Sequence, residues 1–297
     1  MAAGATSVVI RAAPRASRGL WRDALSRLFR NGPAILGLIF IAIFVVGAVL
    51  APIIAPYDPT IGTLALSRHG PNLTHLMGTD LLGRDEFSRV LYGARISLVV
   101  GVVAVAFGLV FGTAIGAIAG GMGGKVDTVL MRVTDVLLAV PGILLAIGIV
   151  AWLGQGQIQI MLAVGISYAP IFARLLRGSL LALREADFAT AARAEGATPA
   201  RILLRHLMPN ALTPLIVQAT LALATAIIDV AGLGFLGLGP GDPRAPEWGE
   251  MLTDSARFLQ NAPYLILFPG AAIVVSAIGF NLLGDGLREA IDPRLKR

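Results

Sequence analysis

Cysteine is absent from the 297 residues of this chain, and lysine occurs only twice, as Lys125 and Lys296. The lack of cysteine excludes disulfides, thiolate metal sites and a cysteine nucleophile. The three histidines, His69, His75 and His206, do not form HExxH or another metal-binding spacing. An intramembrane hydrolase of the Ser/Lys or histidine kind would therefore lack its base. We expect neither catalytic residues nor a cofactor or metal site, and hence no enzyme.

Charged residues are also scarce, at 14% of the chain, whereas hydrophobic residues make up 56% and the mean hydropathy is +0.78. A soluble domain of this length would be much less apolar, so the composition predicts an integral, all-α membrane protein. The net charge of +6 could suggest a nucleic-acid partner. The positive residues instead follow the predicted topology, so no nucleic-acid partner is expected.

Six apolar runs are long enough to cross a hydrocarbon core about 30 Å thick at about 1.5 Å per residue. They cover approximately residues 34–56, 96–120, 128–153, 158–176, 211–234 and 264–283. The second run has glycine at every fourth position from Gly108 to Gly120, a stripe of small residues on one helix face. We expect six transmembrane helices, with the second in the interior of the bundle.

Proline occurs inside three of these runs, as Pro141, Pro170 and Pro269. Each proline removes a backbone donor and bends its helix. Tolerated kinks and hinges that let the bundle rock are both consistent with this pattern.

The lysine and arginine residues are distributed unevenly about the six predicted spans. The segments on the side of both termini hold 18 of the 24, and the segments on the other side hold 6. The positive-inside rule places both termini, and the loop 184–210, in the cytoplasm. The expected parts are a basic cytoplasmic segment 1–33, the span 34–56, an external segment 57–95, a five-helix core 96–287 and a cytoplasmic tail 288–297.

The basic N-terminal segment has an apolar face over residues 19–30 and is expected to lie on membrane lipid. A cleaved signal peptide is the alternative. The apolar run that follows is longer than the roughly 7–15 residues of a signal-peptide core, which favours an uncleaved anchor.

The polar stretch 184–210 lies between two apolar runs. Residues 185–195 are good helix formers, and Gly196 predicts a left-handed helix end. Thr198 followed by Pro199 is typical of the start of a second helix, and Pro209 predicts its end. A DNA-reading helix-turn-helix is disfavoured because the flanking spans hold this loop at the bilayer surface.

The first of these helices places Phe188, Ala191, Ala192 and Glu195 on one face by three- and four-residue spacing. The middle of this face is small, so the backbone of another protein could approach it closely. The pattern predicts a docking surface.

The external segment ends in a glycine-rich turn that contains Asp80, Arg84 and Asp85. Charge-assisted hydrogen bonds among these side chains are expected to lock the turn. On the other side of the predicted membrane, residues 120–126 (GGMGGKV) lack the first glycine and the Ser/Thr of a phosphate loop, so they predict a short interhelical turn.

The loop 184–210 resembles the EAA loop of ABC importer permeases. The resemblance rests on Thr190-Ala191-Ala192, then Gly196, then Pro209, although threonine replaces the usual glutamate and His206 and Met208 replace isoleucine and leucine. It implies a cytoplasmic helix-turn-helix that fits a cleft in an ATP-binding subunit. The coupling residues implied here are Thr190, Ala191, Ala192, Glu195, Gly196, His206 and Pro209.

Four further segments resemble the DppC/OppC branch of dipeptide, oligopeptide and nickel permeases. They are GTDLLGRD at 78–85, SRVLYGAR at 88–95, GLGFLGLG at 232–239 and FNLLGDGLR at 280–288, the last followed by DPR at 292–294. The resemblance covers the chain from about residue 34 onward and implies a type I importer permease of the bacterial inner membrane. Its implied partners are a homologous second permease, two cytoplasmic ATP-binding subunits and an extracytoplasmic binding protein.

The implied role is half of a translocation pathway for di- or oligopeptides, with nickel or glutathione as alternative substrates. Asp135 and Asp229 are the clear carboxylates at membrane depth, and they are candidates for the pathway or its gate. A buried hydrogen bond or ion pair with the second permease is the alternative for Asp229. A stand-alone secondary transporter would show inverted repeats, and none is visible.

Overall fold

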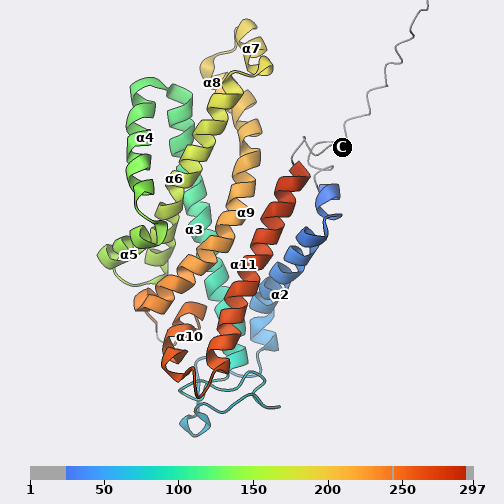
Figure 1. The fold of residues 1–297 in the computed structure, drawn as a ribbon, viewed down its shortest axis with the longest axis vertical. Helices are drawn as coiled ribbons and strands as arrows, with labels where there is room; N and C mark the ends of the chain where they lie inside the picture. Colours follow the sequence, from blue (N-terminus) through green and yellow to red (C-terminus); the bar gives the residue numbers. More distant parts are fainter. Residues whose placement is uncertain (1–24, 243, 292–297) are drawn as a thin grey trace, which may run out of the picture.

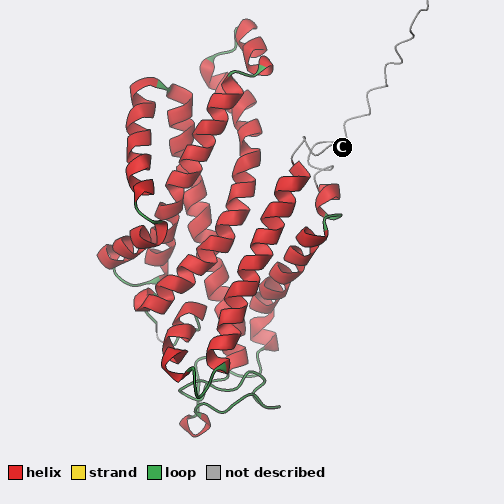
Figure 2. Cartoon of the chain, viewed as in Figure 1, coloured by secondary structure: helices red, strands yellow, loops and turns green. Residues whose placement is uncertain are grey.

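The computed structural model describes residues 25–242 and 244–291, which form an elongated helical bundle (Figures 1 and 2). Within these residues the regular elements are helices, and one isolated β-bridge joins Thr79 to Asp85. The longer helices are α2 (Gly32–Ile54), α3 (Glu86–Met122), α4 (Gly124–Ala139), α5 (Gly142–Leu153), α6 (Gln157–Arg184), α9 (Met208–Leu233) and α11 (Tyr264–Ile291). The shorter ones are η1 (Leu64–Leu66), α7 (Asp187–Ala194), α8 (Pro199–Arg201), η2 (Ile202–Leu207), η3 (Gly234–Leu238), α10 (Trp248–Ser255) and η4 (Ala256–Phe258).

The two ends of the bundle differ in content. Figure 1 shows α7, α8 and the turn from α3 to α4 at one end, together with the start of α2 and the end of α11. Asn31 Nδ2 donates to Glu289 Oε2 at 2.6 Å, which joins the last two of these. The opposite end holds α10 and the irregular chain before α3. Because α2 starts and α11 ends at the same end of the bundle, the chain runs along the bundle an even number of times.

Among the described residues, five single helices are long and apolar enough to span a membrane, and the bent pair α4 and α5 counts as a sixth span if it crosses as one. The predicted third span, residues 128–153, is thus broken into two helices that meet at 94°. Val140 is extended and Pro141 precedes α5. Proline disfavours helical geometry in the residue before it, and it has no N–H with which to continue the helix. By contrast, Pro170 and Pro269 lie inside the unbroken helices α6 and α11.

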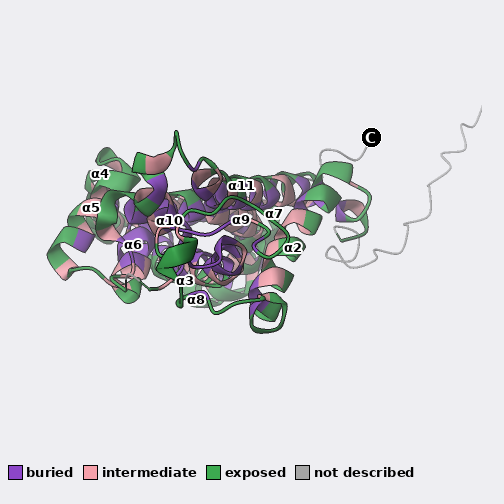
Figure 3. Cartoon of the chain, turned by 90° about the horizontal axis from the view of Figure 1, so that it is seen from below, coloured by how far each residue is buried: buried purple, intermediate pink, exposed green. Residues whose placement is uncertain are grey.

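The glycine stripe of the second predicted span packs as expected. A Cβ added at Gly108, Gly112 or Gly116 would lie 2.7, 2.3 or 2.5 Å from a carbonyl oxygen of α6. These distances leave no room for a side chain, so the α3 and α6 backbones approach closely. Figure 3 views the bundle from its α10 end, with buried positions where helices face one another and exposed positions on the outer faces of α4 and α5.

The helix α3 begins at Glu86, so the last ten residues of the predicted external segment 57–95 form its first turns. Asp85 explains this start, because its Oδ2 accepts from the N–H of Ser88 at 2.8 Å and caps the helix. The predicted parts 1–33 and 288–297 fall largely outside the described residues.

Candidate functional site

The predicted helix-turn-helix is present at one end of the bundle. The helix α7 ends just before Gly196, which has φ of 82°, and the N–H of Ala197 donates to the carbonyl of Ala192 at 3.1 Å. This is the left-handed helix end that glycine favours. Thr198 Oγ1 accepts from the N–H of Arg201 at 3.4 Å, and Pro199 occupies the first turn of α8. Both local signals therefore give the predicted geometry.

Pro209 does not end the second helix, contrary to the prediction. The chain continues from α8 through a π-helical turn, η2, into α9, so that residues 199–238 form one helical stretch. The wider turn accommodates a proline that cannot donate. Asn210 Nδ2 donates to the carbonyl of His206 at 2.7 Å, which adds a side-chain bond to this turn. The loop is thus joined rigidly to α9.

The residues expected on one face of α7 differ in their burial. Ala192, 7% exposed, and Ala189, fully buried, pack in a cluster with Ile202 and Leu207 of η2. Ala192 therefore supports the helix pair from inside and does not face outward with its predicted neighbours. The outward residues are Phe188, Thr190, Ala191, Glu195 and Gly196, and Pro209 is also exposed, whereas His206 is partly buried. We call Phe188, Ala191 and Glu195 the α7 face.

Two arginines tie this helix pair to the rest of the bundle. Arg184 Nη2 donates to the carbonyl of Gly121 at the turn between α3 and α4, and Arg193 Nη2 donates to the carbonyl of Arg184. A Cβ at Gly121 would lie 2.8 Å from Leu203 Cδ2 of η2, so the turn also packs against the second helix. Sequence reasoning missed these contacts, because guanidinium–carbonyl pairs such as Arg184–Gly121, 63 residues apart, leave no local pattern.

Asp135 and Asp229, the predicted pathway carboxylates, both have partners within the chain. Asp135 Oδ1 lies 2.5 Å from Arg174 Nη2, and both side chains are about half exposed, at 48% and 55%. Asp229 Oδ2 accepts from the Tyr168 hydroxyl at 2.8 Å, and that hydroxyl is also 2.8 Å from Thr225 Oγ1. Asp135 thus links α4 to α6, and Asp229 links α9 to α6.

At the other end, the glycine-rich turn has the expected bond between Asp80 and Arg84, whereas Asp85, predicted to join them, bonds to His75 and Ser88. Arg84 Nε donates to Asp80 Oδ2 at 2.5 Å, and the N–H groups of Leu82 and Arg84 donate to Asp80 Oδ1 at 2.9 and 2.8 Å. Asp85 Oδ1 lies 2.9 Å from His75 Nδ1 while its other oxygen caps α3. Gly83 has φ of 72°, and a Cβ there would lie 1.9 Å from the carbonyl oxygen of Thr63. We call residues 57–85 with the start of α3 the external turn.

Further contacts at this end join residues that are distant in sequence, and sequence reasoning did not identify these contacts. Arg89 Nε is 3.5 Å from Asp80 Oδ2, and its guanidinium donates to the carbonyl of Pro59 at 3.2 Å. Trp248, fully buried, donates through Nε1 to the carbonyl of Val90 at 3.0 Å. Glu247 accepts from Ser97 Oγ at 3.1 Å, and burial raises the pKa of this carboxyl. The first turns of α3 are therefore held between the external turn and α10.

Comparison with known proteins places the chain in a transporter family. Residues 112–297 match the family model described as the binding-protein-dependent transport system inner membrane component. Residues 19–73 match the N-terminal transmembrane domain of oligopeptide transport permease C. The chain therefore belongs to the family of inner membrane components of binding-protein-dependent transport systems, that is, ABC importer permeases.

Two relatives are similar over nearly the whole chain. A dipeptide transport system permease protein, DppC, of Alkalihalophilus pseudofirmus is 48% identical over 93% of this chain and 90% of that protein. A glutathione transport system permease protein, GsiD, of Pectobacterium atrosepticum is 41% identical over 98% of this chain and 96% of its own length. Among solved structures, an inward-facing form of the MetNI methionine ABC transporter aligns with a TM-score of 0.58 and 22% identity. That alignment covers 69% of this chain and 96% of the other. At this identity the structural likeness shows the fold alone.

Proposed function

We propose that this chain forms half of the translocation pathway of a bacterial importer for dipeptides and other short peptides. The observation that carries the substrate class is the 48% identity to a permease named for dipeptides over 93% of the chain. Glutathione is the alternative that the second relative supports, and nickel is a third. A homologous permease would supply the other half, and a binding protein would deliver the substrate from outside.

The α7 face is the proposed contact with one of two ATP-binding subunits. Its middle residue, Ala191, is small and exposed, and Phe188 beside it is 40% exposed, so the face offers an apolar contact at a close backbone approach. The buried Ala189 and Ala192 fix its orientation on η2. Closure of the ATP-binding subunits would move α7, and the continuous helix from α8 into α9 would transmit that movement to the pathway. Arg184 would transmit it to the turn before α4.

The orientation that we propose follows from the charge asymmetry of 18 to 6. Both termini and the α7 face would lie in the cytoplasm, and the external turn and α10 would lie outside. A cysteine placed at Arg201 should then react with an impermeant thiol reagent only from the cytoplasmic side, and one placed at Arg68 only from outside. Because the chain has no natural cysteine, each variant carries one thiol. Labelling of the Arg201 position in intact cells would contradict the orientation.

Uptake by the reconstituted complex tests the substrate. Proteoliposomes that contain this chain, the second permease and the ATP-binding subunits should accumulate labelled alanyl-alanine only with both ATP and the binding protein. Glutathione and Ni²⁺ are assayed in parallel. Accumulation of Ni²⁺ alone would contradict the peptide assignment while leaving the importer class intact.

Gly196 gives a matched pair of variants for the docking role. Gly196→Val at φ of 82° is strained by roughly 1–2 kcal/mol, whereas Gly196→Asn keeps a residue that tolerates the left-handed region. A Cβ at this position meets nothing within 4 Å. The valine variant therefore tests backbone strain and not a steric clash within the chain. We expect Gly196→Val to lose ATP-binding subunits on purification and Gly196→Asn to keep them. Equal retention by both variants would contradict the docking role.

A further inference from the structure

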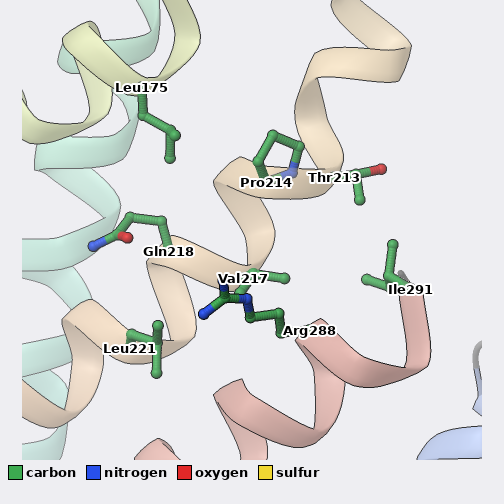
Figure 4. A pocket seen from close by; sticks show the side chains of 8 residues that line it. All are labelled: Leu175, Thr213, Pro214, Val217, Gln218, Leu221, Arg288 and Ile291. Atoms are coloured by element: carbon green, nitrogen blue, oxygen red, sulfur yellow. The ribbon is translucent and has the colours of Figure 1, made fainter. Parts of the chain in front are cut away.

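A cavity of about 410 Å³ lies between α6, α9 and α11, in the half of the bundle nearer to α7. Leu175 of α6, Pro214, Gln218 and Leu221 of α9, and Arg288 of α11 are among its lining residues. Figure 4 shows the Arg288 side chain extending from α11 toward α9, beside Val217. The cavity is thus mostly apolar, with a cation at one edge.

The cavity continues a line of partly exposed side chains along α9. Gln218, Leu221, Thr225 and Asp229 follow one another at three- and four-residue spacing, so they share a helix face. Thr225 and Asp229 meet Tyr168 of α6, and Leu175, seven residues after Tyr168, lies on the same face of α6. The lining of the cavity and the polar contacts of Asp229 therefore belong to one track between α6 and α9.

The two ends of this track carry opposite charges. Asp229 lies toward the external end, and Arg288 lies about three turns of α9 closer to the α7 end, beside Val217 (Figure 4). Among residues 25–242 and 244–291, Arg288 has no hydrogen-bond or ion-pair partner, and neither does the amide of Gln218. Within this part of the chain, nothing occupies the donors of the guanidinium, and their fork matches a carboxylate.

We propose that Arg288 receives the carboxylate of the transported substrate at the cytoplasmic end of the pathway. The proposal rests on the proposed function, because a peptide carries the carboxylate that this site would recognise. The apolar remainder of the cavity accommodates side chains of varied shape, so the site selects the terminal charge and not the sequence of the peptide. An anionic phospholipid headgroup is the rival occupant, and the experiment separates the two.

The test places a single thiol in the cavity, as Val217→Cys, in the complete complex reconstituted in nanodiscs. Its reaction rates with an anionic (sulfonatoethyl) and a cationic (trimethylammonioethyl) methanethiosulfonate report the local potential. We expect Arg288→Gln to lower the anionic-to-cationic rate ratio about fivefold, the change expected from a unit charge about 8 Å away acting with opposite sign on the two reagents in water. Arg257→Gln at the other end of the bundle is the control and should leave the ratio unchanged.

Protection then identifies the ligand. Millimolar alanyl-alanine should slow modification of Val217→Cys severalfold, alanyl-alaninamide should not, and Arg288→Gln should abolish the protection. The proposal is overturned if Arg288→Gln leaves the anionic-to-cationic rate ratio unchanged. It is also overturned if alanyl-alaninamide protects the thiol as well as alanyl-alanine does. A thiol that reacts only with membrane-permeant N-ethylmaleimide also overturns it, in favour of lipid or the second permease in the cavity. Uptake of alanyl-alanine by the same preparation shows separately whether the proposed function stands.

Discussion

The external turn and the α7 helix pair occupy opposite ends of the bundle and are stabilised in different ways. In the external turn, Asp80, Arg84 and Arg89 are at most 7% exposed and bond to one another, and α10 closes the site through Trp248. In the α7 pair, only small and aliphatic residues are buried, and the charged side chains face outward. One end is closed by contacts within the chain, whereas the other leaves a surface for a partner.

We propose that this difference separates residues that hold the permease together from residues that connect it to other subunits. A buried ionic network is costly to break, because each lost partner leaves an uncompensated charge. An exposed helix face contributes little to the stability of the isolated chain, so its changes should appear in assembly and transport. Variants of the two ends should therefore separate effects on stability from effects on assembly and transport.

The largest effect is expected at Asp80. Asp80→Ala leaves the buried guanidiniums of Arg84 and Arg89 without their shared carboxylate, at a cost of roughly 3–5 kcal/mol in the free energy of unfolding. Thermal unfolding in detergent measures the loss. Asp58→Ala changes an exposed aspartate that accepts hydrogen bonds from its sequence neighbour Thr60; it is the control and should shift stability by no more than about 0.5 kcal/mol. If the two variants unfold at similar temperatures, the buried contacts of Asp80 do not stabilise this end of the chain.

Adjacent alanines of α7 allow the same substitution on either side of one helix. Ala192→Leu forces three heavy atoms into the contact with Ile202 and Leu207 and should cost about 1–3 kcal/mol. Ala191→Leu enlarges an exposed position, so stability should stay within about 0.5 kcal/mol while co-purification of the ATP-binding subunits falls. The comparison fails if Ala191→Leu destabilises the chain as much as Ala192→Leu.

Variants of Asp229 and Tyr168 separate the effect of the Asp229 charge on uptake from the effect of its hydrogen bond. Asp229→Asn keeps an acceptor for the Tyr168 hydroxyl but removes the charge, so we expect reduced uptake with an intact complex. Tyr168→Phe removes the hydrogen bond and leaves the charge, so it should cost about 1 kcal/mol of stability and affect uptake less. Uptake assays and subunit co-purification are measured on both. Normal uptake by Asp229→Asn would reject the role of its charge.

A separate prediction concerns the pH dependence of stability at the α10 end. Burial, together with the charges of Glu247 and Asp254, raises the pKa of Glu250 from its usual value near 4.5 to about 7. The carboxyl is therefore favoured in its neutral form in the folded chain, and its contribution to stability is lost as pH rises from about 4.5 to about 7. Glu250→Gln, which stays neutral, should gain stability relative to the wild type between pH 5 and pH 7.5. A difference between the two proteins that does not change with pH would contradict this prediction.

The features that could be predicted from the sequence are set by neighbours along the chain. The left-handed Gly196, the Thr198 cap, the glycine stripe of α3 and the bonds of Asp80 with Arg84 depend on residues at most one helical turn or one regular repeat apart. The charge asymmetry and the long apolar runs reflect the membrane, which acts on every span in the same way.

The features that escaped prediction depend on tertiary contacts. Pro141 signalled a bend, but the 94° angle depends on how α5 packs against α6 and α9. Pro209 signalled a helix end, yet the π-helical turn keeps the helix continuous. The pairs Ser97–Glu247 and Val90–Trp248 join residues about 150 positions apart, and a single sequence contains no record of such pairing.

The central claim is that the exposed side of α7 is the surface on which an ATP-binding subunit docks, whereas the external turn is complete within the chain. Photo-crosslinking from p-benzoylphenylalanine at position 191 of the assembled complex tests it most directly, with the same residue at position 256 near α10 as the reference. We predict a crosslink from position 191 to the ATP-binding subunit and none to that subunit from position 256. An intact, transport-competent complex in which position 191 captures lipid or the second permease, and never the ATP-binding subunit, would contradict the account.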